Sequence, residues 1–220
     1  MSNSQRDVEA AFAQCPLIAI LRGITPQDAL AVGEVLVEAG FTMIEVPLNS
    51  PDAFASIKIL AAGLAGKAVV GAGTLMVPAD AARLAELGAH LAVMPHFDPA
   101  LVAAAKAAGL WCAPGVATPS EGFAALAAGA DALKLFPAEA MPPAVIRAWR
   151  AVFPQATRFL PVGGIDVSNI PAYRAAGASG FGIGSTLFKP GKPVSDIARD
   201  ARALMAAMPQ PALGTARATR

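Results

Sequence analysis

The sequence predicts a (β/α)8 barrel. Eight short β-like runs recur along the chain, and their first residues lie 20 to 26 positions apart. A helix-like segment follows each run, and right-handed strand–helix–strand units of this kind close into a parallel barrel. A doubly wound open sheet is the structural alternative. It fits less well, because eight even units within 220 residues leave no room for a second domain.

The elements follow from local signals. Four pairs of a capping residue and a proline predict helix starts, at Thr25-Pro26, Ser50-Pro51, Asp98-Pro99 and Thr118-Pro119. The segment before Cys15 predicts an extra helix across the bottom of the barrel. We expect one barrel domain over 1–208 and a frayed tail over 209–220. The predicted strands are Leu17–Gly23, Met43–Leu48, Ala68–Leu75, Leu91–His96, Trp111–Val116, Ala132–Pro137, Arg158–Ile165 and Gly180–Leu187.

Composition narrows the class of function. Seventeen basic and 16 acidic residues give a net charge of +1, which argues against nucleic acid as a partner. Two cysteines and two histidines form no metal-ligand motif, so we expect no metal and no cofactor. No apolar run approaches the ~18 residues of a spanning helix, and the first 14 residues are of mixed polarity. The sequence predicts a soluble, cytoplasmic protein with no membrane partner.

Lys134 is the most informative residue, because it interrupts an apolar run, Ala132–Phe136, that otherwise predicts a buried strand. Removing an amine from water lowers its pKa, and the neutral amine is the form that attacks carbonyl carbon. The plainer alternative is a lysine at a strand end whose stem packs while its ammonium reaches water. For one isolated strand that alternative is favoured, so the choice depends on what else faces inward.

Strand alternation sends four polar side chains into the barrel near its C-terminal mouth: Arg22, Glu45, Thr74 and Lys134. On this interpretation Thr74 shares its face with Val70 and Ala72. Barrel enzymes place their chemistry at that mouth. The structural alternative is an inert buried ion pair between Glu45 and either Lys134 or Arg22, but such pairs stabilise folds weakly. Four convergent polar groups favour a functional site.

Glycines define a second cluster. Val162-Gly163-Gly164-Ile165 ends the seventh predicted strand, and Gly182-Ile183-Gly184-Ser185 ends the eighth. Glycine lets backbone N–H groups approach a ligand closely, and the loops after these two strands commonly bind phosphate in barrel enzymes. The two pairs together predict a phosphorylated substrate.

These groups predict a lysine-based carbon–carbon lyase. A neutral lysine amine condenses with a ketone to form an imine, which accepts electrons when a neighbouring C–C bond breaks. The cleavage needs a base for the hydroxyl proton, and Glu45, acting directly or through one water, fits that task.

The chain resembles the class I aldolases that act on 2-keto-3-deoxy-6-phosphogluconate or 2-keto-3-deoxy-6-phosphogalactonate. The resemblance extends from about Pro16 to Phe188. It implies a (β/α)8 barrel, usually a homotrimer, that cleaves a six-carbon phosphosugar acid to pyruvate and glyceraldehyde 3-phosphate. The motifs that carry it are Ile18-Ala19-Ile20-Leu21-Arg22-Gly23-Ile24, Ile44-Glu45-Val46-Pro47-Leu48-Asn49-Ser50-Pro51, Gly71-Ala72-Gly73-Thr74-Leu75, Leu133-Lys134-Leu135-Phe136-Pro137-Ala138 and Pro161-Val162-Gly163-Gly164-Ile165.

The resemblance also implies roles for single residues. It makes Lys134 the Schiff-base lysine, Glu45 the general acid/base and Thr74 a contact to the pyruvoyl portion. Arg22 resembles an arginine that binds an anionic end of the substrate, either carboxylate or phosphate. The other residues expected at the substrate are Gly163, Gly164, Gly184 and Ser185 around the phosphate, Phe136 as a wall, and Asn49.

Two departures from the phosphogluconate branch bear on the substrate. That branch carries arginine and threonine where this chain has Asn49-Ser50, and threonine where it has Val162. The segment Pro47–Pro51 resembles the phosphogalactonate branch, so we expect that C4 epimer as the main substrate. The alternatives are the phosphogluconate epimer, a non-catalytic phosphosugar sensor, and another phosphate-binding barrel enzyme such as a phosphosugar isomerase or a thiamine phosphate synthase-like transferase.

Overall fold

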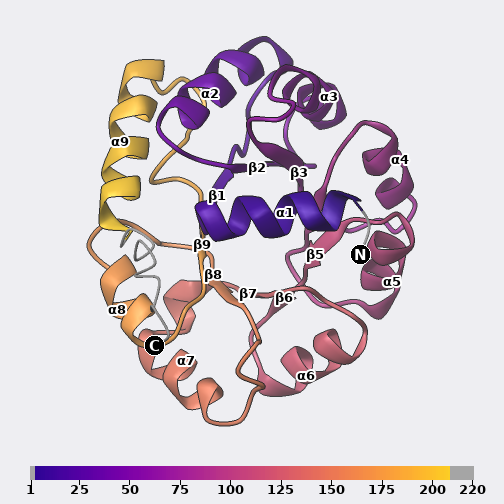
Figure 1. The fold of residues 1–220 in the computed structure, drawn as a ribbon, viewed down its shortest axis with the longest axis vertical. Helices are drawn as coiled ribbons and strands as arrows, with labels where there is room; N and C mark the ends of the chain where they lie inside the picture. Colours follow the sequence, from indigo (N-terminus) through magenta and orange to yellow (C-terminus); the bar gives the residue numbers. More distant parts are fainter. Residues whose placement is uncertain (1–2, 209–220) are drawn as a thin grey trace, which may run out of the picture.

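The computed structural model describes residues 3–208, and these residues form a barrel of parallel strands surrounded by helices (Figure 1). Each predicted strand contains an observed one, but the observed strands are shorter. The expected frayed tail, 209–220, lies outside the described residues. The strands are β1 Leu17–Ile20, β2 Met43–Pro47, β3 Val69–Gly73, β4 Leu91–Val93, β5 Trp111–Ala113, β6 Gly115–Val116, β7 Leu133–Leu135, β8 Phe159–Pro161 and β9 Phe181–Ile183.

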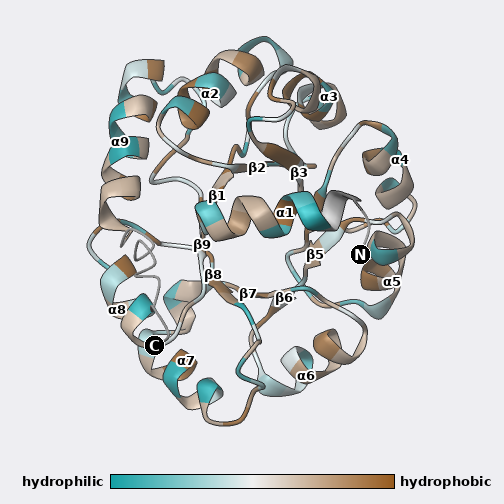
Figure 2. Ribbon diagram, in the orientation of Figure 1, coloured by the Kyte–Doolittle hydropathy of each residue, from teal (hydrophilic) through white to brown (hydrophobic). Residues whose placement is uncertain are grey.

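Helices alternate with these strands. Figure 2 shows the helices mixed in polarity, as expected for elements with one face toward the sheet and one toward water. No helix within residues 3–208 is long and apolar enough to cross a membrane. The helices are α1 Asn3–Gln14, α2 Pro26–Glu38, α3 Ala53–Gly63, α4 Asp80–Glu86, α5 Pro99–Ala107, α6 Pro119–Ala127, the 3-10 turn η1 Ala138–Ala140, α7 Pro143–Arg150, α8 Ile170–Ala175 and α9 Val194–Ala207.

The barrel closes through two joined sheets. One sheet has the order β5-β4-β3-β2-β1-β9, and the other has the order β6-β7-β8. β5 and β6 are parts of one barrel strand separated by Pro114, so they join the sheets on one side. A parallel bridge between Val162 and Gly182 joins them on the other side, where β8 meets β9. The eight predicted strands therefore form one closed cylinder.

Helix starts follow the capping prolines in three of the four predicted places. Thr118 caps α6 in a reciprocal capping box with Glu121, and Asp98 accepts a hydrogen bond from Ala100 at the start of α5. The exception is Ser50-Pro51, because α3 begins at Ala53. The Ser50 hydroxyl accepts a hydrogen bond from the Gly23 backbone (2.9 Å), so this serine ties the loop after β2 to the loop after β1.

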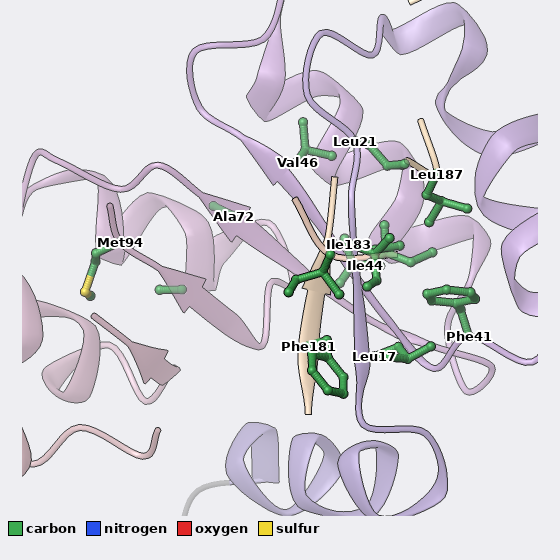
Figure 3. Close-up of a cluster of buried hydrophobic side chains, with 14 of the residues drawn as sticks. Leu17, Leu21, Phe41, Ile44, Val46, Ala72, Met94, Phe181, Ile183 and Leu187 are labelled. Carbon is green, nitrogen blue, oxygen red and sulfur yellow. The ribbon is translucent and has the colours of Figure 1, made fainter. Parts of the chain in front are cut away.

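Two separate apolar clusters lie on the two faces of the strands. The outer cluster fills the space between strands and helices, and Figure 3 shows part of it, with Leu17, Ile44 and Ile183 from neighbouring strands. The inner cluster fills the lower lumen and includes Ile18, Met43 and Leu160. The inward and outward side chains that alternation predicts for β1 and β2 are therefore confirmed.

For β3 the predicted phase is wrong. Val70 and Ala72 belong to the outer cluster, and Val69 belongs to the inner one, so the inward positions are Val69, Gly71 and Gly73. Thr74 follows the end of β3 and adopts a left-handed conformation (φ 55°). Because Thr74 lies beyond the pleated segment, strand alternation does not decide where its side chain goes.

The N-terminal helix closes the lower end of the barrel, as predicted, and Figure 1 shows α1 lying across the opening. Val8 and Phe12 belong to the inner cluster, and the Phe12 ring centroid lies 6.4 Å from that of Trp111. An ion pair between Glu9 and Arg158 adds a polar link at the rim. A ligand would therefore enter the lumen from the opposite end, where the strands have their C-terminal ends.

Candidate active site

Lys134 lies at the centre of β7 with its side chain inside the barrel. The residue is 4% exposed, so the alternative of an ammonium that reaches bulk water does not hold. Desolvation by burial lowers the pKa of the Lys134 amine, and the positive charge of Arg22 acts in the same direction, while the Glu45 carboxylate opposes both. The Lys134 Nζ lies 4.6 Å from the centroid of the Phe136 ring.

Glu45 projects from β2 into the same part of the lumen. It is 2% exposed, and its Oε2 atom accepts no hydrogen bond from the described residues. Burial raises the pKa of this carboxyl to about 7, although the charges of Lys134 and Arg22 pull it down. A carboxyl that titrates near neutral pH is well suited to both accept and return a proton.

The absence of a side chain at Gly73 leaves room for the Glu45 carboxylate. A Cβ atom built on Gly73 would lie 1.5 Å from Glu45 Oε2, so any larger residue would displace the carboxylate. β2 and β3 are paired in register with Pro47 opposite Gly73, which fixes this glycine beside the strand that carries the glutamate. The glycine is therefore part of the site, although it has no functional group.

Lys134 and Glu45 face one cavity without forming an ion pair. Within residues 3–208, no oxygen of Glu45 lies within 4.0 Å of the Lys134 or Arg22 nitrogens, so the alternative of an inert buried salt bridge is wrong. The cavity holds about 10 Å³, the scale of a single water molecule, and its other walls are apolar. The arrangement places an amine and an acid near each other with neither neutralised by direct contact.

Arg22 stands at the mouth above β1, where two neutral groups orient it. Its Nη1 donates to Asn49 Oδ1 (2.7 Å), and its Nη2 donates to Thr74 Oγ1 (3.4 Å). Both partners follow the ends of β2 and β3, so the guanidinium leans toward that side of the mouth. The left-handed backbone at Thr74 brings its hydroxyl into this contact, which strand alternation did not predict.

The glycine cluster lines a second, open cavity of about 300 Å³ at the mouth. Ile20 and Val162 line both this cavity and the small one that holds Lys134, so the two are adjacent. Gly184 leaves open space where a side chain would be. The predicted site residues that line the larger cavity are Arg22, Phe136, Gly163, Gly164, Gly184 and Ser185.

A further cavity, of about 350 Å³, lies at the closed end of the barrel between α1 and the starts of β2 and β3. Asp7, Thr42 and His90 line this cavity, whereas Lys134 and Glu45 do not. Among residues 3–208, no three His, Cys, Asp or Glu side chains gather as metal ligands would. The convergence of perturbed ionisable groups favours the mouth over the closed end as the active site.

Two charged residues of the mouth were not predicted. Glu139, from η1, and Lys189, from the loop after β9, line the same cavity as the glycines. Both follow the C-terminal end of a barrel strand, which is a position-based signal that sequence analysis could have used. Neither lies in a strand, so no periodicity indicated the direction of its side chain.

The raised pKa of Glu45 predicts a pH-dependent stability. Neutral Glu45 contributes stability that is complete below the ordinary carboxyl pKa of 4.5 and is lost as the pH rises through about 7. Glu45→Gln removes this titration. We therefore expect the free energy of unfolding of the variant, relative to the parent, to rise by about 2.5 kcal/mol between pH 5 and pH 8. Urea unfolding at the two pH values measures it, and a constant difference would contradict the burial of the acid.

Comparisons with known proteins agree with this geometry. The family model described as KDPG and KHG aldolase matches residues 8–199. A probable 2-dehydro-3-deoxy-6-phosphogalactonate aldolase of Rhizobium meliloti is 45% identical, over 87% of this chain and 91% of that protein. A solved structure described as native KDPGal is 41% identical, with a TM-score of 0.87 over 88% of this chain and 94% of that one.

One more distant relative has been solved with a covalent intermediate bound. The crystal structure of a KDPG aldolase from Legionella pneumophila, with pyruvate captured at low pH as a covalent carbinolamine intermediate, is 29% identical, with a TM-score of 0.79 over 89% of this chain and 96% of that one. The match of the family model spans most of the barrel, and the curated relative exceeds 40% identity over nearly its whole length. The chain belongs to the KDPG and KHG aldolase family.

Proposed function

We propose that the protein is a class I aldolase that cleaves 2-dehydro-3-deoxy-6-phosphogalactonate to pyruvate and D-glyceraldehyde 3-phosphate. One observation carries this assignment most strongly: Lys134 and Glu45 are both buried, face the same cavity and form no ion pair. The amine is thereby biased toward its nucleophilic neutral form, and the acid is poised near neutrality. Family membership supplies the reaction type, and the relatives named above support the substrate.

The reaction begins at the C2 carbonyl. The neutral Lys134 Nζ attacks this carbon, and a proton passes to the carbonyl oxygen to give a carbinolamine. Glu45 in its acid form then protonates the departing hydroxyl, so that water leaves and a protonated imine remains beside the Glu45 carboxylate. Glu45 is the buried acid available to move these protons, directly or through one water.

Cleavage follows when Glu45 removes the proton of the C4 hydroxyl. The C4 oxygen becomes the aldehyde carbonyl, the C3–C4 bond breaks, and its electron pair moves into the imine to give an enamine. Glyceraldehyde 3-phosphate leaves. Glu45 returns a proton to C3, and water hydrolyses the resulting imine to release pyruvate and the free lysine.

The two ends of the substrate match the two sides of the mouth. Arg22 leans toward the ends of β2 and β3 through Asn49 and Thr74, which supports a role in holding the C1 carboxylate. The glycines that follow β8 and β9 line the open cavity on the other side, which supports phosphate binding there. Phe136 and Val162 would flank the carbon chain between the two ends.

Val162 bears on the choice between the C4 epimers. It lines both cavities, so it lies between the reacting lysine and the glycine cluster. A valine offers no hydrogen bond, and a site that cannot pair a substrate hydroxyl disfavours the epimer that needs that contact. This supports the galactonate epimer as the main substrate.

We also propose that the protein is a cytoplasmic homotrimer. Its phosphorylated substrate class supports the location, since charged sugar phosphates do not cross membranes freely. The surface of the described residues carries large exposed apolar side chains that subunit contacts could bury, namely Ile59, Met76, Val77, Phe123, Val152, Val167 and Val194. Sedimentation equilibrium should give three times the 22.2 kDa chain mass, and a single-chain mass would refute the trimer.

The imine predicts a covalent trap. Sodium borohydride added with pyruvate should reduce the imine and leave a stable adduct on Lys134, which intact mass and peptide mapping would locate. Lys134→Met should take up no adduct and lose turnover, whereas Lys58→Met, which alters an exposed lysine of α3, should behave like the parent. An adduct-free parent that still releases pyruvate would refute the proposal, and so would an active Lys134→Met protein.

The epimer assignment predicts a ratio of rates. Pyruvate release from the galactonate epimer should exceed that from the gluconate epimer. Val162→Thr should raise the relative kcat/KM for the gluconate epimer by about tenfold, the scale of one added hydrogen bond. Equal rates of the parent on the two epimers would withdraw the galactonate assignment and leave the aldolase in place.

A further inference from the structure

An acidic side chain lies against the glycine turn expected to bind phosphate. A Cβ atom built on Gly163 would lie 2.3 Å from Glu139 Oε2, and one built on Gly164 would lie 2.9 Å from Glu139 Cγ. Both glycines have positive φ, at 108° and 61°. The absence of side chains at this turn therefore makes room for the Glu139 carboxylate as well as for a ligand.

The other charges of the cavity do not neutralise this carboxylate. Arg22 and Lys189 line the cavity too, yet within residues 3–208 neither forms an ion pair with Glu139. Glu139 also accepts no hydrogen bond from the described residues, and its side chain is exposed. The open cavity thus contains a free acid at the position where an incoming anion must approach the backbone.

We propose that the Glu139 carboxylate competes with the substrate phosphate for the Gly163–Gly164 turn and thereby sets how strongly the enzyme prefers phosphorylated over unphosphorylated aldehydes. The inference rests on the proposed function for the identity of the substrate. It adds a specificity-determining residue that lines the open cavity and not the small cavity that holds Lys134. A phosphate must displace the carboxylate and remain near its charge, whereas a neutral hydroxyl end meets no such repulsion.

The effect has a predictable size. Glu139 is exposed, so water screens its charge, and like charges a few ångströms apart in such surroundings repel weakly. A dianionic phosphate doubles the interaction, which places the expected preference change at about three- to tenfold. Lys189 lines the same cavity with the opposite charge, so its removal should act in the opposite direction.

The condensation direction tests this directly, because pyruvate can be offered D-glyceraldehyde 3-phosphate or D-glyceraldehyde as the acceptor. The measured quantity is the ratio of kcat/KM for the phosphorylated acceptor over the unphosphorylated one. Glu139→Gln should raise this ratio about three- to tenfold, and Lys189→Gln should lower it. Glu34→Gln, an equal charge change on the exposed side of α2, should leave it unchanged. Calorimetry with inorganic phosphate should show about three- to tenfold tighter binding to Glu139→Gln.

Several outcomes would overturn the inference. An unchanged ratio with an unchanged phosphate Kd would show that the carboxylate does not compete. A lower ratio in Glu139→Gln would make Glu139 an acceptor for a substrate hydroxyl instead, and a shift of the same sign in both variants would exclude a charge effect. If the parent used neither aldehyde, the proposed aldolase activity would be refuted. The role of Glu139 would still be tested, because the Kd for inorganic phosphate is measured without turnover.

Discussion

The structure depends on the burial of an amine and a carboxyl, Lys134 and Glu45, in one closed lumen without direct contact between them. Each group loses water that it would keep at the surface, and neither recovers that loss through an ion pair. As a consequence, the pKa of the Lys134 amine is lowered and the pKa of the Glu45 carboxyl is raised, so the amine is easier to deprotonate and the acid is easier to protonate. Glu45 can therefore exchange a proton near neutral pH.

The rest of the fold keeps water away from Lys134 and Glu45. α1 seals the lower end of the barrel, and the inner apolar cluster fills the lumen beneath the two groups. The parallel register of β2 and β3 sets Gly73 where its missing side chain leaves room for the Glu45 carboxylate. Stability and function are coupled here, since a more stable core could be built with an apolar residue in place of either ionisable group.

From the lumen the site opens toward one side of the mouth. Ile20 and Val162 form an apolar passage between the reacting groups and the glycine-lined cavity. Lys134 and Glu45 lie at the inner end of that passage, and Arg22, Glu139 and the glycines lie at its outer end, around the open cavity. Such a layout suits a ligand that places its reacting carbons in the lumen and its anionic groups at the mouth.

The sequence predicts the barrel, its eight strands, and the inward positions of Lys134 and Glu45, because β2 and β7 alternate regularly and carry strong apolar signals on their outer faces. It assigned β3 the wrong phase, because the inward positions Gly71 and Gly73 have no side chains to mark them. It placed Thr74 in a strand that ends one residue earlier. Glu139 was missed since a 3-10 turn has no periodicity that fixes its direction.

The most direct test is the titration of the Lys134 amine itself, followed by NMR in protein with isotope-labelled lysine and assigned by comparison with Lys134→Met. We expect its pKa to lie below the ordinary lysine value of 10.5, and to fall further in Glu45→Gln, where the carboxylate that favours the charged amine is gone. An amine that titrates at the ordinary value, and does not respond to Glu45→Gln, would contradict a dehydrated lysine coupled to a buried acid.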